Sequence, residues 1–187
     1  MTKLEMKKEI LALIEELNPE SEYLTQDPDI SAKIDSVINH IMFEVVRFRK
    51  LPKYIEMEVN EGDVVTFADL EKECGNEIYQ IDLVRNIKHS FRADGTVIKF
   101  LESGTAEIDV FVFPERITEK TKDKSYEFEL PADSLEIMIY GVAADLLKSD
   151  ESAQFGQNYA IRYSDMMSRL DSRYAMPSIQ IEGGVVI

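Results

Sequence analysis

The stretch Ala106-Glu107-Ile108-Asp109-Val110-Phe111-Val112-Phe113 decides the fold, because it opens with strictly alternating apolar and acidic side chains. A period of two puts successive side chains on opposite faces of an extended chain and is typical of a half-buried strand. Similar runs occupy residues 54–59, 78–84, 96–100 and 125–130. Turn signals between several of them contain Gly62, Gly95 and Gly104. The sequence therefore predicts a small antiparallel β domain over residues 54–130.

On the N-terminal side of this region the apolar period changes to that of a helix. A first helix is expected to begin near Thr2, with one apolar face made by Leu4, Ile10, Leu11, Ile14 and Leu17. The segment from Pro19 to Pro28 breaks this pattern, because proline lacks an amide donor. A second helix is expected to begin at Asp29 or Ser31 and to end before Pro52.

Helical periodicity returns on the C-terminal side, where proline and capping residues in Pro131-Ala132-Asp133-Ser134 indicate a helix start. Small residues in this helix, Gly141, Ala143 and Ala144, predict close approach by another helix. A last helix is expected from about Ser152 to Arg173. The predicted fold is therefore α+β, with a helical body built from both chain ends (residues 1–53 and 131–177), an inserted antiparallel β domain (54–130) and an extended tail (178–187).

The charge of the chain is strongly acidic, with 36 Asp and Glu against 21 Lys and Arg and a formal net charge of -15. Counted over long segments, residues 1–50 carry 10 acids and 7 bases, residues 51–130 carry 18 and 10, and residues 131–187 carry 8 and 4. None of the three segments is basic. This distribution argues against sequence-specific binding of nucleic acid, which needs a positive patch to displace counterions from phosphates.

Compartment signals point to a soluble protein of a reducing environment. The single cysteine, Cys74, excludes an intrachain disulfide. The charged N-terminus lacks the apolar core of a signal peptide, and no stretch approaches the ~20 apolar residues that span a bilayer. We therefore expect no membrane association.

Catalytic motifs are missing from the sequence. His40 and His89 have no partners at metal-ligand or catalytic spacing, and Cys74 is flanked by carboxylates that oppose thiolate formation. Carboxylates recur two residues apart, and such pairs could assemble a glycosidase dyad or a metal site. The pairs are Glu56/Glu58, Glu61/Asp63, Glu71/Glu73 and Glu127/Glu129. The solvent-exposed face of any acidic sheet shows the same pattern of acids two residues apart. We therefore expect no enzyme activity, no cofactor and no metal.

The C-terminal segment is apolar and β-prone. Its apolar residues are Ile179, Ile181, Val185, Val186 and Ile187, and Gly183-Gly184 divides them. One interpretation is a last strand on the protein's own sheet. The other is strand addition to a neighbouring protein, in which backbone hydrogen bonds supply affinity.

The C-terminal third resembles the head-to-tail connector (adaptor, or head-completion) proteins of long-tailed bacteriophages. Four segments carry the resemblance: the helix Leu135 to Leu147, the helical stretch Tyr159 to Arg173, the tail Ile179 to Gly184, and a strand, proline, polar turn and Ala-rich helix from Val110 to Ala144. The resemblance covers roughly the last 80 residues. The first fifty residues share only their helical character with that family.

The resemblance implies a structural virion protein that forms a ring of twelve copies at the head-tail interface, assembled in the host cytoplasm. Its implied partners are the portal protein, a tail or stopper protein, and other copies of itself, with DNA passing through the channel without specific binding. The tail residues Ile179, Ile181, Val185, Val186 and Ile187 are then candidates for the portal or inter-subunit contact. The alternatives are a tail-completion protein, an acidic β-domain protein that binds a ligand or carbohydrate, and, last, an enzyme built on the paired acids.

Overall fold

The computed structural model of the protein describes residues 1–21, 24–148 and 153–170. Five helices and six strands follow one another in these ranges: α1 (Lys3–Leu13), α2 (Pro28–Arg49), β1 (Pro52–Val59), β2 (Val64–Thr66), α3 (Phe67–Cys74), β3 (Ile78–Arg85), β4 (His89–Phe91), β5 (Val97–Phe100), β6 (Gly104–Val112), α4 (Ala132–Leu146) and α5 (Ala153–Arg169). The predicted α+β class is confirmed.

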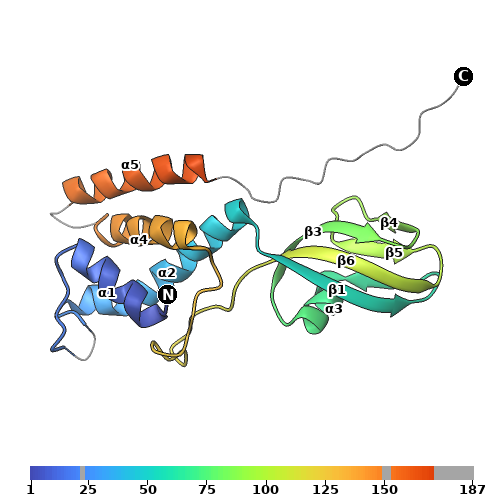
Figure 1. Ribbon diagram of the computed structural model, residues 1–187, viewed down its shortest axis with the longest axis horizontal. Helices are drawn as coiled ribbons and strands as arrows, with labels where there is room; N and C mark the ends of the chain where they lie inside the picture. The colour runs from blue at the N-terminus through green and yellow to red at the C-terminus, as the bar shows by residue number, and fades with distance from the viewer. Residues whose placement is uncertain (22–23, 149–152, 171–187) are drawn as a thin grey trace, which may run out of the picture.

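The molecule consists of two bodies placed end to end along its long axis (Figure 1). Helices α1, α2, α4 and α5 form the helical body, and the six strands with α3 form the β domain. Each body has a separate hydrophobic core. The chain enters the β domain between α2 and β1 and leaves it after β6. The helical body is therefore built from both chain ends around an inserted β domain, as predicted.

The N-terminal helices begin at cap residues. The Thr2 hydroxyl accepts the amide of Glu5 at 3.2 Å, and the Glu5 carboxylate accepts the amide of Thr2 at 2.8 Å. Helix α2 begins slightly earlier than expected, because Asp27 accepts the amides of residues 29 and 30 and Pro28 takes the first helical position. The start of each helix is thus stabilised by side chains adjacent to it in the sequence.

Helix α4 lies at the centre of the helical body and contacts α1, α2 and α5. At Gly141 an added Cβ would lie 2.8 Å from Ile41 Cγ2 and 2.8 Å from the Tyr163 ring. These separations are too short for carbon atoms in a close-packed core. The prediction that small residues on this helix permit close approach is therefore confirmed for Gly141, which α2 and α5 both approach closely.

The β domain consists of two three-stranded antiparallel sheets, ordered β1-β6-β3 and β2-β5-β4. Buried side chains from both sheets form one core, in which Ile108 and Phe100 are fully buried. Along β6, the residues from Ala106 to Val110 alternate as the sequence indicates, with Glu107 and Asp109 on the face opposite the core, whereas Val110, Phe111 and Val112 are all buried. The domain is therefore a small sandwich, and α3 packs near β1, β2 and β3.

Helix α3 is an element that the sequence reading missed. Its start is marked by a capping box between Thr66 and Asp69, and its end by Gly75 in the left-handed conformation. These signals are visible in the sequence. The helix has only eight residues, too few for apolar periodicity to reveal it between strands.

The strand expected over residues 125–130 is wrong. This segment forms only an isolated bridge between Thr2 and Glu127. Its alternating apolar residues, Tyr126, Phe128 and Leu130, are buried in the core of the helical body instead. An extended chain lying on helices needs the same alternation as a strand in a sheet, so the pattern alone does not distinguish the two.

Candidate functional site

Helix α5 carries the two most exposed large apolar side chains of the described residues. Helix α5 lies on one side of the helical body (Figure 1) and packs on it through Tyr159, Tyr163 and Met167. Phe155 and Ile161 are 62% and 69% exposed. Phe155 lines a small hollow together with Leu13, Ile14 and Tyr159. Ile161 lies on the other side of the helix and faces solvent, so it is the candidate contact residue of this helix.

The junction between the two bodies is an aromatic stack, here called the aromatic junction (Phe43, Tyr79, Phe111 and Phe113). The ring centroids are 4.8 Å apart for Phe43 and Phe113, 4.8 Å for Tyr79 and Phe113, and 6.3 Å for Tyr79 and Phe111. The Tyr79 hydroxyl donates to the carbonyl of Val46 at 3.2 Å. Because Phe43 belongs to α2 and Tyr79 to β3, the stack couples the helical body to the β domain.

Cations surround the aromatic junction. Arg116 lies 4.7 Å from the centre of the Phe43 ring, Arg47 lies 5.4 Å from that of Phe113, and Lys50 lies 4.6 Å from that of Phe111. A cation over a ring face is attracted by the ring quadrupole. Burial raises the pKa of Tyr79 to about 12, although the positive charge of Arg47 acts in the opposite direction. The Tyr79 hydroxyl therefore keeps its proton, and its hydrogen bond to Val46, at higher pH than an exposed tyrosine would.

A partly buried cluster of charged side chains, here called the Lys3 cluster, consists of Lys3, Lys7, Asp35 and Asp123. The Lys3 side chain is 2% exposed, and its Nζ lies 2.9 Å from Asp35 and 2.8 Å from Asp123. Lys7 Nζ lies 2.9 Å and 3.3 Å from the same two carboxylates. Lys3 also donates to the carbonyl of Thr121 at 3.2 Å. The cluster joins α1 and α2 to the segment between β6 and α4.

The pKa values in the Lys3 cluster favour its charged form. Burial alone would raise the pKa of Asp123, but the hydrogen bond from Lys3 and the charges of Lys7 and Lys3 outweigh it and lower the pKa. Burial alone would lower the pKa of Lys3, but hydrogen bonds to Asp123 and Asp35 outweigh it and raise the pKa. The cluster therefore stabilises the fold while both groups are ionised.

These directions predict how stability depends on pH. The contribution of Asp123 is present above its ordinary pKa of 3.8 and is lost as pH falls through the lowered value. The contribution of Lys3 is present below 10.5 and is lost as pH rises through the raised value. In urea unfolding, the stability difference between the native chain and Asp123→Asn should be constant from about pH 5 to pH 9 and shrink below pH 3.8. A difference that persists unchanged to pH 2 would contradict the prediction.

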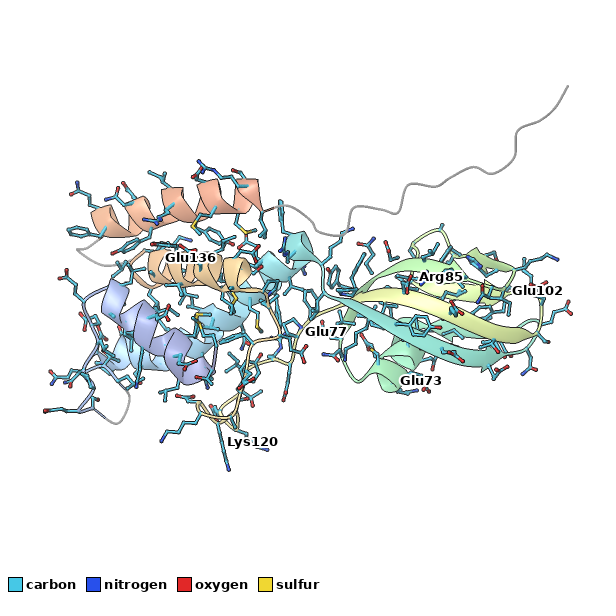
Figure 2. The ribbon with its side chains drawn as sticks, in the orientation of Figure 1. Glu73, Glu77, Arg85, Glu102, Lys120 and Glu136 are labelled. Atoms are coloured by element: carbon cyan, nitrogen blue, oxygen red, sulfur yellow. The ribbon has the colours of Figure 1, made fainter. Side chains whose placement is uncertain are left out.

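The solvent side of the β1-β6-β3 sheet is acidic and is here called the acidic face (Glu56, Glu58, Glu107 and Asp109). Glu56 on β1 pairs in register with Glu107 on β6. Arg85, which Figure 2 labels on the β domain, hydrogen-bonds Asp109 and lies 3.8 Å from Glu107. The interpretation of Glu56 and Glu58 as the wet face of a sheet is confirmed, since both side chains are exposed on β1.

The other paired acids do not converge. Glu71 and Glu73 lie on α3, where Glu71 accepts the amide of Ile78 at 2.9 Å. Asp63 accepts the amide of Asn60 at 2.7 Å in the turn after β1. Glu127 and Glu129 are exposed beside the helical body. Among the described residues, no group of three or more His, Cys, Asp or Glu is placed to hold a metal ion.

His40, His89 and Cys74 lie on different elements and do not form a common site. His40 is exposed on α2 at a groove of about 440 Å³ between α2, α4 and α5, which Tyr163 also lines. Burial, with the nearby Glu44 carboxylate, raises the pKa of the Tyr163 hydroxyl. His89 Nδ1 lies 3.0 Å from the carbonyl of Ile87, and Cys74 Sγ lies 3.4 Å from that of Asn76.

A basic loop was missed when charge was counted over long segments. Lys120, Lys122 and Lys124 lie between β6 and α4, all three are exposed, and none forms an ion pair within the described part of the chain. Figure 2 shows Lys120 on a loop that extends away from both bodies. The K-x-K-x-K pattern is visible in the sequence, but the acids of residues 51–130 conceal it in the total.

The tail residues Ile179, Ile181, Val185, Val186 and Ile187 lie outside the described residues. The helices that the structure describes include none long and apolar enough to cross a bilayer. No protein-family model matches the chain, and no curated protein matches it.

Proposed function

We propose that the protein is a structural assembly subunit that forms a ring between the portal and the tail of a bacteriophage. The observation that carries this proposal is the outer surface of α5, where Ile161 is 69% exposed on the side of the helix away from its contact with α4. In a ring, this surface would pack against the adjacent subunit. Burial of the apolar area would then supply the association free energy.

Two further features support a structural role. The aromatic junction couples two bodies with separate cores, so a subunit can hold one neighbour with each body at a defined spacing. The net charge of -15 opposes tight binding of DNA. A conduit needs this property, because phosphates must pass without being held.

The test is assembly on the portal protein encoded beside the gene. Negative-stain microscopy of the mixture should show rings for the native chain. Ile161→Asp should abolish the rings while circular dichroism remains native, because the charge would be buried between subunits without a partner. The matched control is Val64→Asp, which places the same charge at an exposed aliphatic residue of the β domain (55% exposed) and should leave the rings intact.

Two results would overturn the proposal. One is a gene neighbourhood without portal and capsid genes. The other is ring formation by Ile161→Asp that equals the native chain.

A further inference from the structure

We propose that the loop of residues 116–124 is a docking surface for a second copy of this chain, whose acidic face it contacts. The contact would join Lys120, Lys122 and Lys124 of one copy to Glu56 and Glu58 of the next. This inference rests on the proposed function in one respect, namely that a ring needs a contact of this kind between subunits. Self-association through the loop can nevertheless be tested in the absence of a portal.

The loop is anchored firmly at both ends, so its lysines are presented in a defined arrangement. At the first end the Asn39 side chain donates to the carbonyl of Ile117 at 2.7 Å and accepts its amide at 2.9 Å. At the other end Asp123 binds Lys3 and Lys7 of α1. Asp123 is thereby neutralised, which leaves Glu119 as the remaining acid among the residues from 116 to 124.

The charges of the loop and of the β domain are opposite. Residues 116–124 contain four bases and two acids, a net charge of 4 − 2 = +2. Residues 52–113 contain six bases and thirteen acids, a net charge of 6 − 13 = −7. The acidic face itself holds four carboxylates and one Arg85, so three loop lysines would match its excess of three negative charges.

The two surfaces lie on different bodies of the subunit. The loop extends from the helical body, and the acidic face belongs to the β domain (Figure 2). A contact between two different surfaces is heterologous, and repeated rotation from one copy to the next generates a closed ring or an open filament. This is the interface type that a ring subunit requires.

A second copy fits the loop better than a nucleic acid does. Three lysines on a chain of net charge -15 form a small positive patch in a repulsive field. Phosphate binding draws its affinity from many neutralised phosphates. The acidic face, in contrast, is present on every copy at the same concentration as the loop.

The experiment is sedimentation velocity of the full chain at high concentration, in about 50 mM and about 500 mM salt. The native chain should associate at low salt and dissociate at high salt. The variant Lys120→Glu/Lys122→Glu/Lys124→Glu should associate at least about tenfold more weakly, because like charges would face each other. The variant Glu56→Lys/Glu58→Lys should show the same loss. An equimolar mixture of the two should regain association, since each reversed surface then meets an opposite charge.

The matched control is Lys33→Glu/Lys72→Glu/Lys99→Glu, which changes the net charge equally at three exposed lysines elsewhere on the surface. It should associate more strongly than the loop variant, and circular dichroism should show native folding for every chain.

Failure would take recognisable forms. A native chain that stays monomeric at low salt, a mixture that does not regain association, or a control as weak as the loop variant would each overturn the inference. The inference would also be overturned if the native chain bound duplex DNA without self-associating and the loop variant lost that binding.

The two proposals can fail separately. Rings on a portal that depend on Ile161 but not on the loop lysines would overturn this inference alone. Salt-dependent association without portal rings would overturn the proposed function alone.

Discussion

Replacing Lys3 by alanine is expected to lower the free energy of unfolding by about 3 kcal/mol. The Lys3 side chain is 2% exposed and lies between the carboxylates of Asp35 and Asp123, which its loss would leave facing each other with only Lys7 between them. Breaking a buried ion pair costs about 3–5 kcal/mol, and the two carboxylates here retain some solvent contact, which places the effect at the lower end. Urea unfolding measured at neutral pH tests this value.

The matched control is Lys33→Ala. Lys33 is 61% exposed and lies 3.9 Å from Asp29 on the surface of α2. Its removal should change stability by less than about 0.5 kcal/mol. If Lys3→Ala were no more destabilising than this control, the Lys3 cluster would not hold α1 to the rest of the helical body.

Replacing Phe113 by alanine is expected to destabilise the protein by about 3–5 kcal/mol. Phe113 is 6% exposed, and Phe43 and Tyr79 flank its ring at centroid distances of 4.8 Å. The truncation removes the centre of the aromatic junction and leaves a cavity where the two bodies meet. The β domain should then move more freely relative to the helical body.

Two measurements check this result. Urea unfolding gives the stability loss, and amide hydrogen exchange should accelerate in β3, which carries Tyr79. The control Phe155→Ala removes an equal side chain that is 62% exposed and should cost less than about 0.5 kcal/mol. Unchanged exchange in β3 would show that the stack does not couple the bodies.

The elements of the fold were largely readable from local patterns. Alternation over residues 106–113 predicted β6, and helical periodicity with the small residue Gly141 predicted a central helix in close contact with its neighbours. The cap at Thr2 marked the start of α1. Each of these signals lies within one element, where side-chain spacing is a direct consequence of backbone geometry.

The candidate contact surfaces were harder to predict from the sequence than the helices and strands. The exposure of Ile161 depends on which side of α5 meets α4, and the K-x-K-x-K loop disappeared in a sum over many acids. The tail, Ile179 to Ile187, lies outside the described residues, so its role stays a prediction.

The sequence by itself determined the order of helices, strands and helices and the acidity of the β domain, because period and charge are properties of the chain. Only the tertiary structure decided that residues 125–130 lie on helices rather than in a sheet, that Lys3 meets Asp123, and that Phe43 meets Phe113. These contacts join residues about 70 to 120 positions apart. Which residues meet depends on how whole helices and sheets pack together. The alternation or charge of one segment is compatible with several different partners, so it does not predict the contact.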